Sequence, residues 1–145
     1  MEYSISSQLN VDTIVDKAGS GGTNVKVANT STYVSDGGAV TQNTVQSLCK
    51  IWCSTNHNST GTHTINDSFN TSSVTDGGVG RTTNTYTNNF SSGNYSAVLG
   101  TTNDNNQSGI ETGPSTSSIV IVTYQYNGTT EDTTAQNSAM FGDLA

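Results

Sequence analysis

Residues 47–54 read Ser-Leu-Cys-Lys-Ile-Trp-Cys-Ser, and this stretch decides the fold class of the chain. In an extended chain, the side chains at positions 48, 50 and 52 point to one side and those at 49, 51 and 53 to the other. Ile51 and Trp52 are residue types that favour strands. The two-residue period therefore predicts a β-strand.

Similar short strand-like segments follow at intervals of roughly ten residues. The further candidate strands are 64–70, 72–76, 81–88, 95–101, 117–126 and 137–142. Asp76-Gly77-Gly78 and Asn127-Gly128 are hairpin-type turn sequences, because Gly and Asn reach positive φ at little cost. Only residues 41–48 offer a short helical alternative. We therefore predict an all-β fold, an antiparallel β-sandwich or jelly-roll over residues 47–145.

Residues 1–46 are patterned more weakly than the rest of the chain. Their short apolar runs are separated by the glycine-rich segments 19–22 and 36–38, and none is long enough for a stable core. We interpret them as an extended N-terminal arm that could contain a β-hairpin, and the alternative is a flexible terminus.

The composition is polar without being highly charged. Hydrophobic residues make up 30% of the 145 residues and charged residues only 10%. A small domain with so few large apolar side chains buries a modest core and is marginal alone. Association of identical chains would supply the missing burial, so we expect an oligomer.

The net charge of −7 argues against two classes of partner. Binding a nucleic acid or an anionic membrane surface requires a basic patch that neutralises several phosphates, and the few basic residues of this chain do not form one. The basic residues are Lys17, Lys26, Lys50 and Arg81. Residues 1–10 have no signal-peptide pattern, and no apolar run approaches the ~20 residues of a membrane span. We expect assembly in a cytoplasm, where thiols stay reduced.

Cys49, Cys53, His57 and His63 are the best candidates for a metal site, because thiolates and neutral imidazoles are good zinc ligands. Their spacing is poor. If both cysteines lie on one strand they are about 13 Å apart, too far for a shared Zn²⁺ or a disulfide. The alternative is two buried thiols and two loop histidines near a turn, and we predict no metal and no cofactor.

Carboxylates offer two further hypotheses. Asp67 and Glu111 could pair as the acids of a glycosidase, but no converging set of catalytic groups accompanies them, so we predict no catalytic residues and no enzyme. Acidic residues in predicted loops could instead bind a cation, with solvated loops as the alternative. These are Asp104, Glu111, Glu131 and Asp132.

Several segments together resemble a domain found in tailed bacteriophages of marine and freshwater type, including cyanophages. In that family a K-x-W strand precedes a DSFN-x-SS-x-TD-x-G-x-G block, and Cys53 departs from the pattern. The matching segments are LNVDTI at 9–14, SLCKIW at 47–52, DSFNTSSVTDGGVG at 67–80, TYT at 85–87, NYS at 94–96 and MFGDL at 140–144. Members are labelled tail-fibre or virion structural proteins.

The resemblance implies a non-enzymatic structural protein on the virion surface, and phage surface proteins in general suggest a homotrimer. Two roles compete: a capsid decoration (cement) protein that binds the major capsid protein, and a tail-fibre or appendage component for host attachment. We favour decoration, because the arm suits contacts with neighbours and the chain has no coiled-coil shaft. The expected arm contacts to the shell or a neighbouring subunit are Ile5, Leu9, Val11, Ile14, Val25 and Val27.

Four aromatic residues are expected in the core or in a seam between subunits. They are Trp52, Phe69, Tyr124 and Tyr126. Trp52 could also stack on a sugar, but a tryptophan in a strand is more often part of the core.

Overall fold

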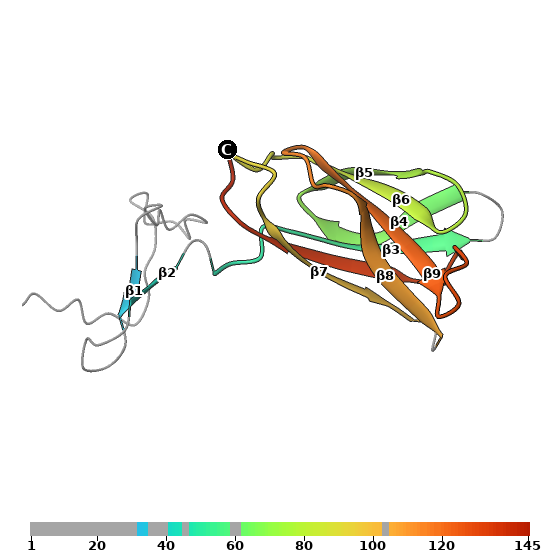
Figure 1. Cartoon of the computed structure of the whole chain (residues 1–145). Coiled ribbons are helices and arrows are strands. Elements are labelled where there is room, and N and C mark those ends of the chain that lie inside the picture. The colour runs from blue at the N-terminus through green and yellow to red at the C-terminus, as the bar shows by residue number, and fades with distance from the viewer. Residues whose placement is uncertain (1–31, 35–40, 45–46, 59–61, 103–104) are drawn as a thin grey trace, which may run out of the picture.

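A computed structural model describes residues 32–34, 41–44, 47–58, 62–102 and 105–145 of the chain. It is a β-sandwich, in which two antiparallel four-stranded sheets pack face to face (Figure 1). The strands are β1 Thr32–Val34, β2 Thr41–Asn43, β3 Ile51–Asn58, β4 Thr62–Phe69, β5 Thr71–Asp76, β6 Arg81–Tyr86, β7 Ser96–Thr101, β8 Asn106–Thr112, β9 Ser118–Gln125 and β10 Gln136–Phe141.

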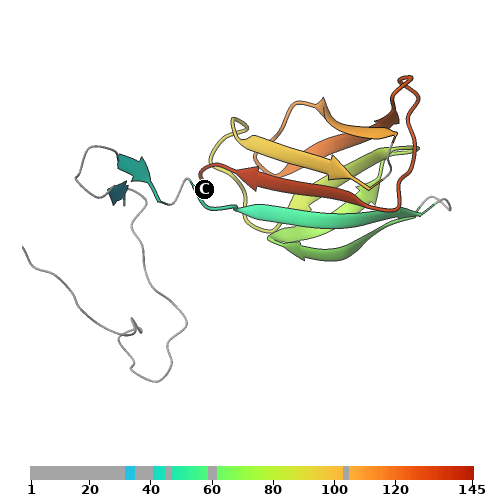
Figure 2. The same cartoon turned by 90° about the horizontal axis from the view of Figure 1, so that it is seen from below.

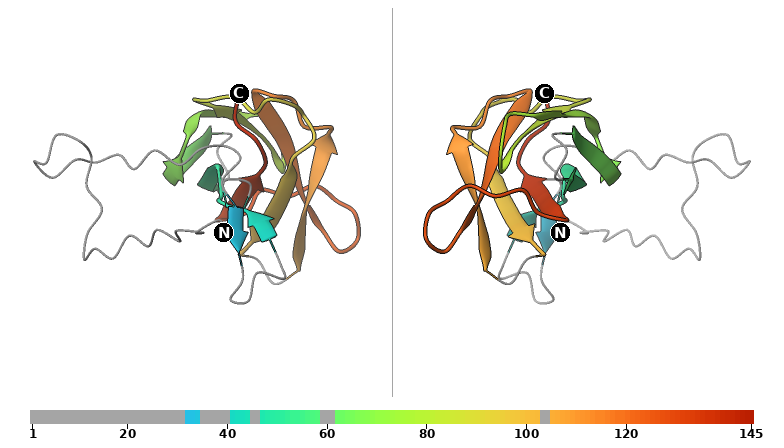
Figure 3. Two further views of the ribbon diagram at one scale, coloured as in Figure 1. Left: turned by 90° about the vertical axis from the view of Figure 1, so that its left-hand side faces the viewer. Right: turned by 90° about the vertical axis from the view of Figure 1, so that its right-hand side faces the viewer.

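The two sheets have the strand orders β4-β3-β10-β7 and β5-β6-β9-β8. Figure 2 looks onto the first sheet, and Figure 3 shows the two layers nearly end on. The predicted turn at Asp76 is confirmed, because it joins β5 to β6 and Gly78 there has a φ of 104°. The turn at Asn127-Gly128 is also confirmed, with the Gly128 N–H donating to the carbonyl of Gln125.

Three strand or helix predictions need correction. The first strand begins at Ile51 rather than 47 and continues to Asn58. Strand β8 was not predicted, because its sequence NQSGIET has only one large apolar residue and its strand conformation comes from pairing with β9. The helix at 41–48 is wrong: β2 occupies its beginning, and the described residues contain no helix.

Within the expected arm, the structure describes one antiparallel strand pair. β1 pairs with β2, with Tyr33 opposite Gln42. The suggested β-hairpin in residues 1–46 is thus confirmed as a strand pair. The six expected arm contacts, from Ile5 to Val27, lie outside the described residues. The described residues form no helix suited to crossing a membrane.

The interior of the sandwich divides into an apolar half and a polar half. The apolar half lies where β3 begins and β6 and β10 end, and its cluster is Ile51, Tyr86, Phe90, Ile119, Ile121 and Met140. At the opposite end of the same strands the buried residues are polar, namely Thr55, His57, His63, Thr82, Thr123 and Gln136. Hydrogen bonds join the sheets there, including one from Gln136 Nε2 to Thr123 Oγ1 at 2.7 Å. The fold therefore places its buried polar chemistry at one end of the sandwich.

Candidate metal centre

Two histidine rings lie face to face inside the polar half. His57 on β3 stands directly opposite His63 on β4, and both side chains are buried. Their ring centroids are 4.1 Å apart and the ring planes differ by 10°. Residues 51, 53, 55 and 57 share the inner face of β3, since successive side chains of a strand alternate. The same alternation that buries Ile51 therefore buries His57.

The hydroxyl of Thr82 joins the two rings along one edge. Thr82 Oγ1 lies 2.7 Å from His57 Nε2 and 2.9 Å from His63 Nδ1, and Thr82 is fully buried on β6. A hydroxyl has one proton to donate and two lone pairs that accept. When both ring N–H groups donate to Thr82, the other nitrogen of each ring carries a lone pair.

Two carboxylates lie beside His63. Its Nε2 is 3.7 Å from Asp76 Oδ1 and 3.8 Å from Asp132 Oδ1. Each carboxylate is oriented by a glycine of the β5–β6 turn: the Gly78 N–H donates to Asp76 at 2.7 Å and the Gly80 N–H to Asp132 at 2.6 Å. Asp132 belongs to the segment between β9 and β10, so residues far apart in the sequence meet here.

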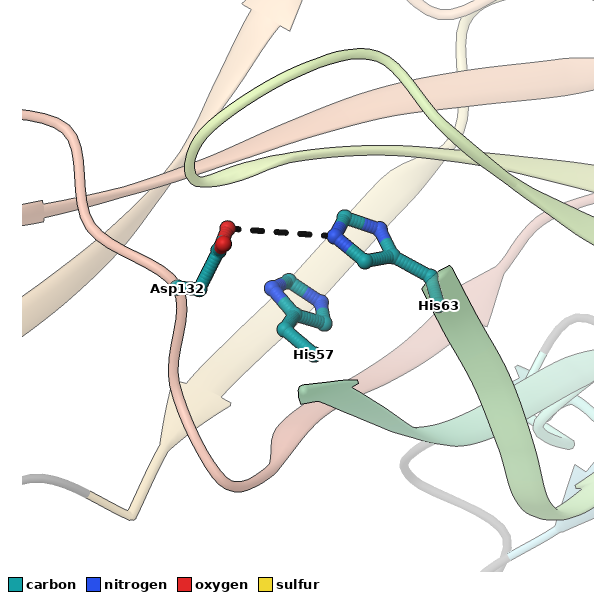
Figure 4. A group of neighbouring side chains, drawn as sticks. All are labelled: His57, His63 and Asp132. Carbon is teal, nitrogen blue, oxygen red and sulfur yellow. Dashed lines mark ion pairs between the residues drawn. The ribbon is translucent and has the colours of Figure 1, made fainter. Parts of the chain in front are cut away.

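Several buried polar atoms in this half of the interior make no hydrogen bond of good geometry, among them His57 Nδ1, His63 Nε2 and Gln136 Oε1. The Gln136 side chain nevertheless lies close enough to His57 to act on its pKa. Figure 4 shows that one nitrogen of each ring lies on the side facing Asp132. One ligand atom from each of His57, His63 and Asp132 lies within 4.8 Å of the others. Unpaired polar atoms are costly in an interior, so this cluster calls for an additional partner.

The electrostatics keep one ring neutral. Burial, with the neighbouring His63 ring, lowers the pKa of His57 from 6.5 to about 4. Asp132, Gln136 and Asp76 act in the opposite direction and are outweighed. A neutral imidazole has a free lone pair, the form in which histidine binds metals.

The metal-ligand candidates that the structure brings together differ from the set considered from the sequence. The histidines are not loop residues, which corrects that expectation. Cys49 precedes β3, so the two cysteines do not share a strand, and both are free thiols. Of the acidic loop candidates, Asp132 joins the histidines, while Glu111 pairs with Arg81. Asp104 lies outside the described residues. The sequence analysis thus considered the two histidines with the cysteines and Asp132 apart from them, and the prediction of no metal stays a prediction.

Asp76, Thr82 and Gln136 were not recognised as site residues. Extending the two-residue period of residues 47–54 onward would have placed His57 on the face of Ile51. Nothing in the spacing of the other three indicates that they meet, because they lie on different strands. The proposed glycosidase pair is not assembled either, since Asp67 and Glu111 lie in different sheets.

The four aromatic residues expected in a core or seam are not core residues of the single chain. Trp52 is 37% exposed, Phe69 54% and Tyr126 78%, and Tyr124 is half-buried. The core alternative is wrong for Trp52 because its strand turns Ile51 and Cys53 inward. Trp52 and Phe69 are cross-strand neighbours on the outer face of the first sheet, whereas the two tyrosines belong to the other sheet or its end. Their place in a seam stays a prediction.

The Thr82 bridge can be tested with a near-isosteric substitution. Thr82→Val removes the oxygen that both rings contact, and we expect it to lower the free energy of unfolding of the metal-free protein by about 1–3 kcal/mol. Urea unfolding followed by tryptophan fluorescence measures the change. Thr83→Val is the matched control, because Thr83 points out of the sandwich. Equal losses in the two variants would contradict the bridging role.

In comparisons with protein-family models, with curated proteins and with solved structures, the chain matches none of them.

Proposed function

We propose that the protein is a non-enzymatic structural protein of the bacteriophage virion surface, assembled as a homotrimer. The virion role and the trimer rest on the resemblance of the chain's segments to phage surface proteins, and association between chains is supported by an apolar row across the outer face of the first sheet. In this row Phe69 on β4 pairs with Trp52 on β3, Trp52 with Ala139 on β10, and Ala139 with Val98 on β7. We call these four residues the apolar row.

The apolar row spans all four strands and contains no charge. Phe69, Trp52 and Val98 are exposed, and Val98 is the most exposed of them, at 61%. A continuous row of exposed apolar side chains is a candidate interaction site. Burying the row between subunits would add apolar burial to a domain whose own core is small. The large apolar side chains that the described residues expose are Leu48, Trp52, Phe69, Val79, Val98, Ile110, Tyr126 and Leu144.

We infer that the occupant of the apolar row is a second copy of the chain, because the row is where two acidic copies can meet with the least repulsion. Each copy carries a net charge of −7, so copies repel one another wherever acidic surfaces meet. An uncharged apolar row avoids this repulsion and gains the burial that the interior lacks. The row is therefore the best place for a contact between subunits.

Within this proposal we favour a capsid decoration protein. The arm of residues 1–46 would add strands to the major capsid protein or to a neighbouring subunit, using apolar residues such as Leu9 and Val25. A protein that binds only the assembled shell stabilises that state by mass action. Host-cytoplasm assembly and a final location on the virion belong to the same proposal.

A tail-fibre or appendage protein for host attachment is the second candidate. It is favoured by the exposed Tyr126, next to the turn at Asn127-Gly128, which could contact a host surface. Copy number per particle separates the two roles: hundreds of copies indicate decoration, and a few to a few dozen indicate a tail component. Turnover of a polysaccharide by the purified protein would contradict the non-enzymatic role.

The apolar row makes a direct prediction about self-association. Val98→Asp places a charge in the row, and we expect it to weaken association at least tenfold, measured by sedimentation equilibrium. Val79→Asp is the matched control: Val79 is 58% exposed but lies in the β5–β6 turn. A Val98→Asp protein that associates as strongly as the Val79→Asp protein would remove the row from the interface.

A further inference from the structure

We propose that His57, His63, Asp132 and Asp76 bind one Zn²⁺ ion, which clamps the polar end of the sandwich. The inference is independent of the proposed virion role. It rests on three donor side chains, His57, His63 and Asp132, whose ligand atoms lie within 4.8 Å of one another. The Asp76 carboxylate lies beside His63, and one nitrogen of each buried ring makes no hydrogen bond of good geometry.

The two distances from His63 Nε2 need only a small contraction to suit zinc, and the ligand atoms of His57, His63 and Asp132, which lie within 4.8 Å of one another, would draw together around the ion. Bonds of roughly 2.0 Å from Zn²⁺ to nitrogen or oxygen place tetrahedral ligand atoms about 3.3 Å apart. His63 Nε2 already lies 3.7 Å from Asp76 Oδ1 and 3.8 Å from Asp132 Oδ1. The exposed fractions of these carboxylate side chains, 25% and 21%, leave a short path for the ion to enter.

The donor types and the charges also suit zinc. Imidazole nitrogen and carboxylate oxygen are common zinc ligands, and imidazole favours the borderline ions over Mg²⁺ or Ca²⁺. Two carboxylates and one divalent ion sum to zero charge, with both imidazoles neutral. A neutral cluster is the arrangement that a partly buried site tolerates best.

Thr82 is the positioning residue for both rings. If His57 Nε2–H and His63 Nδ1–H both donate to its oxygen, His57 Nδ1 and His63 Nε2 present lone pairs on the same side. Metal-bound histidines usually donate their second N–H in this way, which fixes the tautomer. The Gly78 and Gly80 N–H groups donate to the Asp76 and Asp132 carboxylates and so fix their orientation.

The bound ion would be structural. It joins β3 and β4 of one sheet to the end of β5 in the other, and ties in the β9–β10 segment through Asp132. This is the half of the interior that has no large apolar cluster. Zinc would bind the folded chain and not the unfolded one, so it would raise stability by mass action.

The experiment uses the full chain, freed of metal with a chelator and then dialysed. We expect it to bind one Zn²⁺ per chain, by isothermal titration and by elemental analysis after dialysis. At free Zn²⁺ about 100-fold above Kd, the Tm should rise by roughly 10 °C. Co²⁺ should bind at the same site with the visible absorption of a tetrahedral complex. Failure of the folded chain to retain zinc would overturn the proposal.

Matched variants locate the ion. Asp132→Asn should weaken zinc binding at least tenfold and abolish most of the Tm rise, whereas Glu131→Gln, the same change at the neighbouring acid, should leave both unchanged. Cys49→Ser should also bind one equivalent, because neither thiol belongs to the site. Loss of zinc in Cys49→Ser, or wild-type affinity in Asp132→Asn, would overturn the assignment. Thr82→Val should weaken binding while leaving the stoichiometry at one ion per chain.

Discussion

Replacing Gly80 with alanine should destabilise the protein by roughly 2–5 kcal/mol, from strained φ and from overpacking together. Gly80 has a φ of 71°, in the left-handed region that a Cβ atom disfavours. A Cβ there would also lie 2.8 Å from the backbone nitrogen of Glu131 and press even more closely on the carbonyl oxygen of Thr123. Both obstacles are backbone atoms held by hydrogen bonds: the Thr123 N–H donates to the Gly80 carbonyl, and the Glu131 N–H donates to the Thr123 carbonyl. Moving either atom would disturb one of these bonds.

Gly128→Ala separates the two contributions. Gly128 has a φ of 86°, yet nothing lies within 4 Å of the Cβ that alanine would add. Its loss should be limited to the conformational cost of about 1–2 kcal/mol. Chemical unfolding of both variants measures the difference, and losses of equal size would show that the close approach at Gly80 has no energetic weight. Gly80→Ala should in addition displace Asp132, because the Gly80 N–H orients that carboxylate.

Replacing Phe90 with alanine should cost about 3–5 kcal/mol, a large share of the stability of a small domain. Phe90 is among the largest fully buried side chains. Its ring stacks on Tyr95 at a centroid distance of 4.1 Å and meets the edge of Tyr86 at 5.6 Å. Removing the ring leaves a cavity bordered by the backbone of Gly142, which cannot fill it.

Tyr126→Ala is the surface control for this substitution, since Tyr126 is 78% exposed. It should change the free energy of unfolding by less than about 0.5 kcal/mol. Thermal and urea unfolding of the two variants, at a protein concentration low enough to exclude association, gives the comparison. A Phe90→Ala loss below about 1 kcal/mol would mean that the apolar half of the interior collapses around the gap.

The strands were predictable where residue type and period agree. β9 reads Ser-Ile-Val-Ile-Val-Thr-Tyr-Gln, and its β-branched residues favour a strand in almost any sheet. β8 shows the opposite case, because its polar sequence becomes a strand only through hydrogen bonds to β9. The turns were predictable for the same reason, because the residues that form them interact within the turn: the Asp76 carboxylate accepts a hydrogen bond from the Gly78 N–H.

The candidate metal centre was only partly visible in the sequence. His57 and His63 were noticed as ligands, but they were grouped with cysteines that lie elsewhere. The sequence indicates Asp132 only as one of four acidic residues in predicted loops, and nothing in it places that residue beside the histidines. Thr82 was not noticed at all, because a threonine in a polar strand carries no sign that its hydroxyl faces two imidazoles.

By itself, the sequence determined an all-β chain with turns at its Asp-Gly and Asn-Gly steps, because those preferences act within a few residues. Alternation along 47–54 showed that the first strand has two different faces, but not which face is inner. Only the tertiary structure decided that, by packing Ile51 and Cys53 against the second sheet and leaving Trp52 outside. It also brought His57, His63 and Asp132 together, because that meeting depends on sheet pairing and on how the sheets pack, which no local pattern specifies.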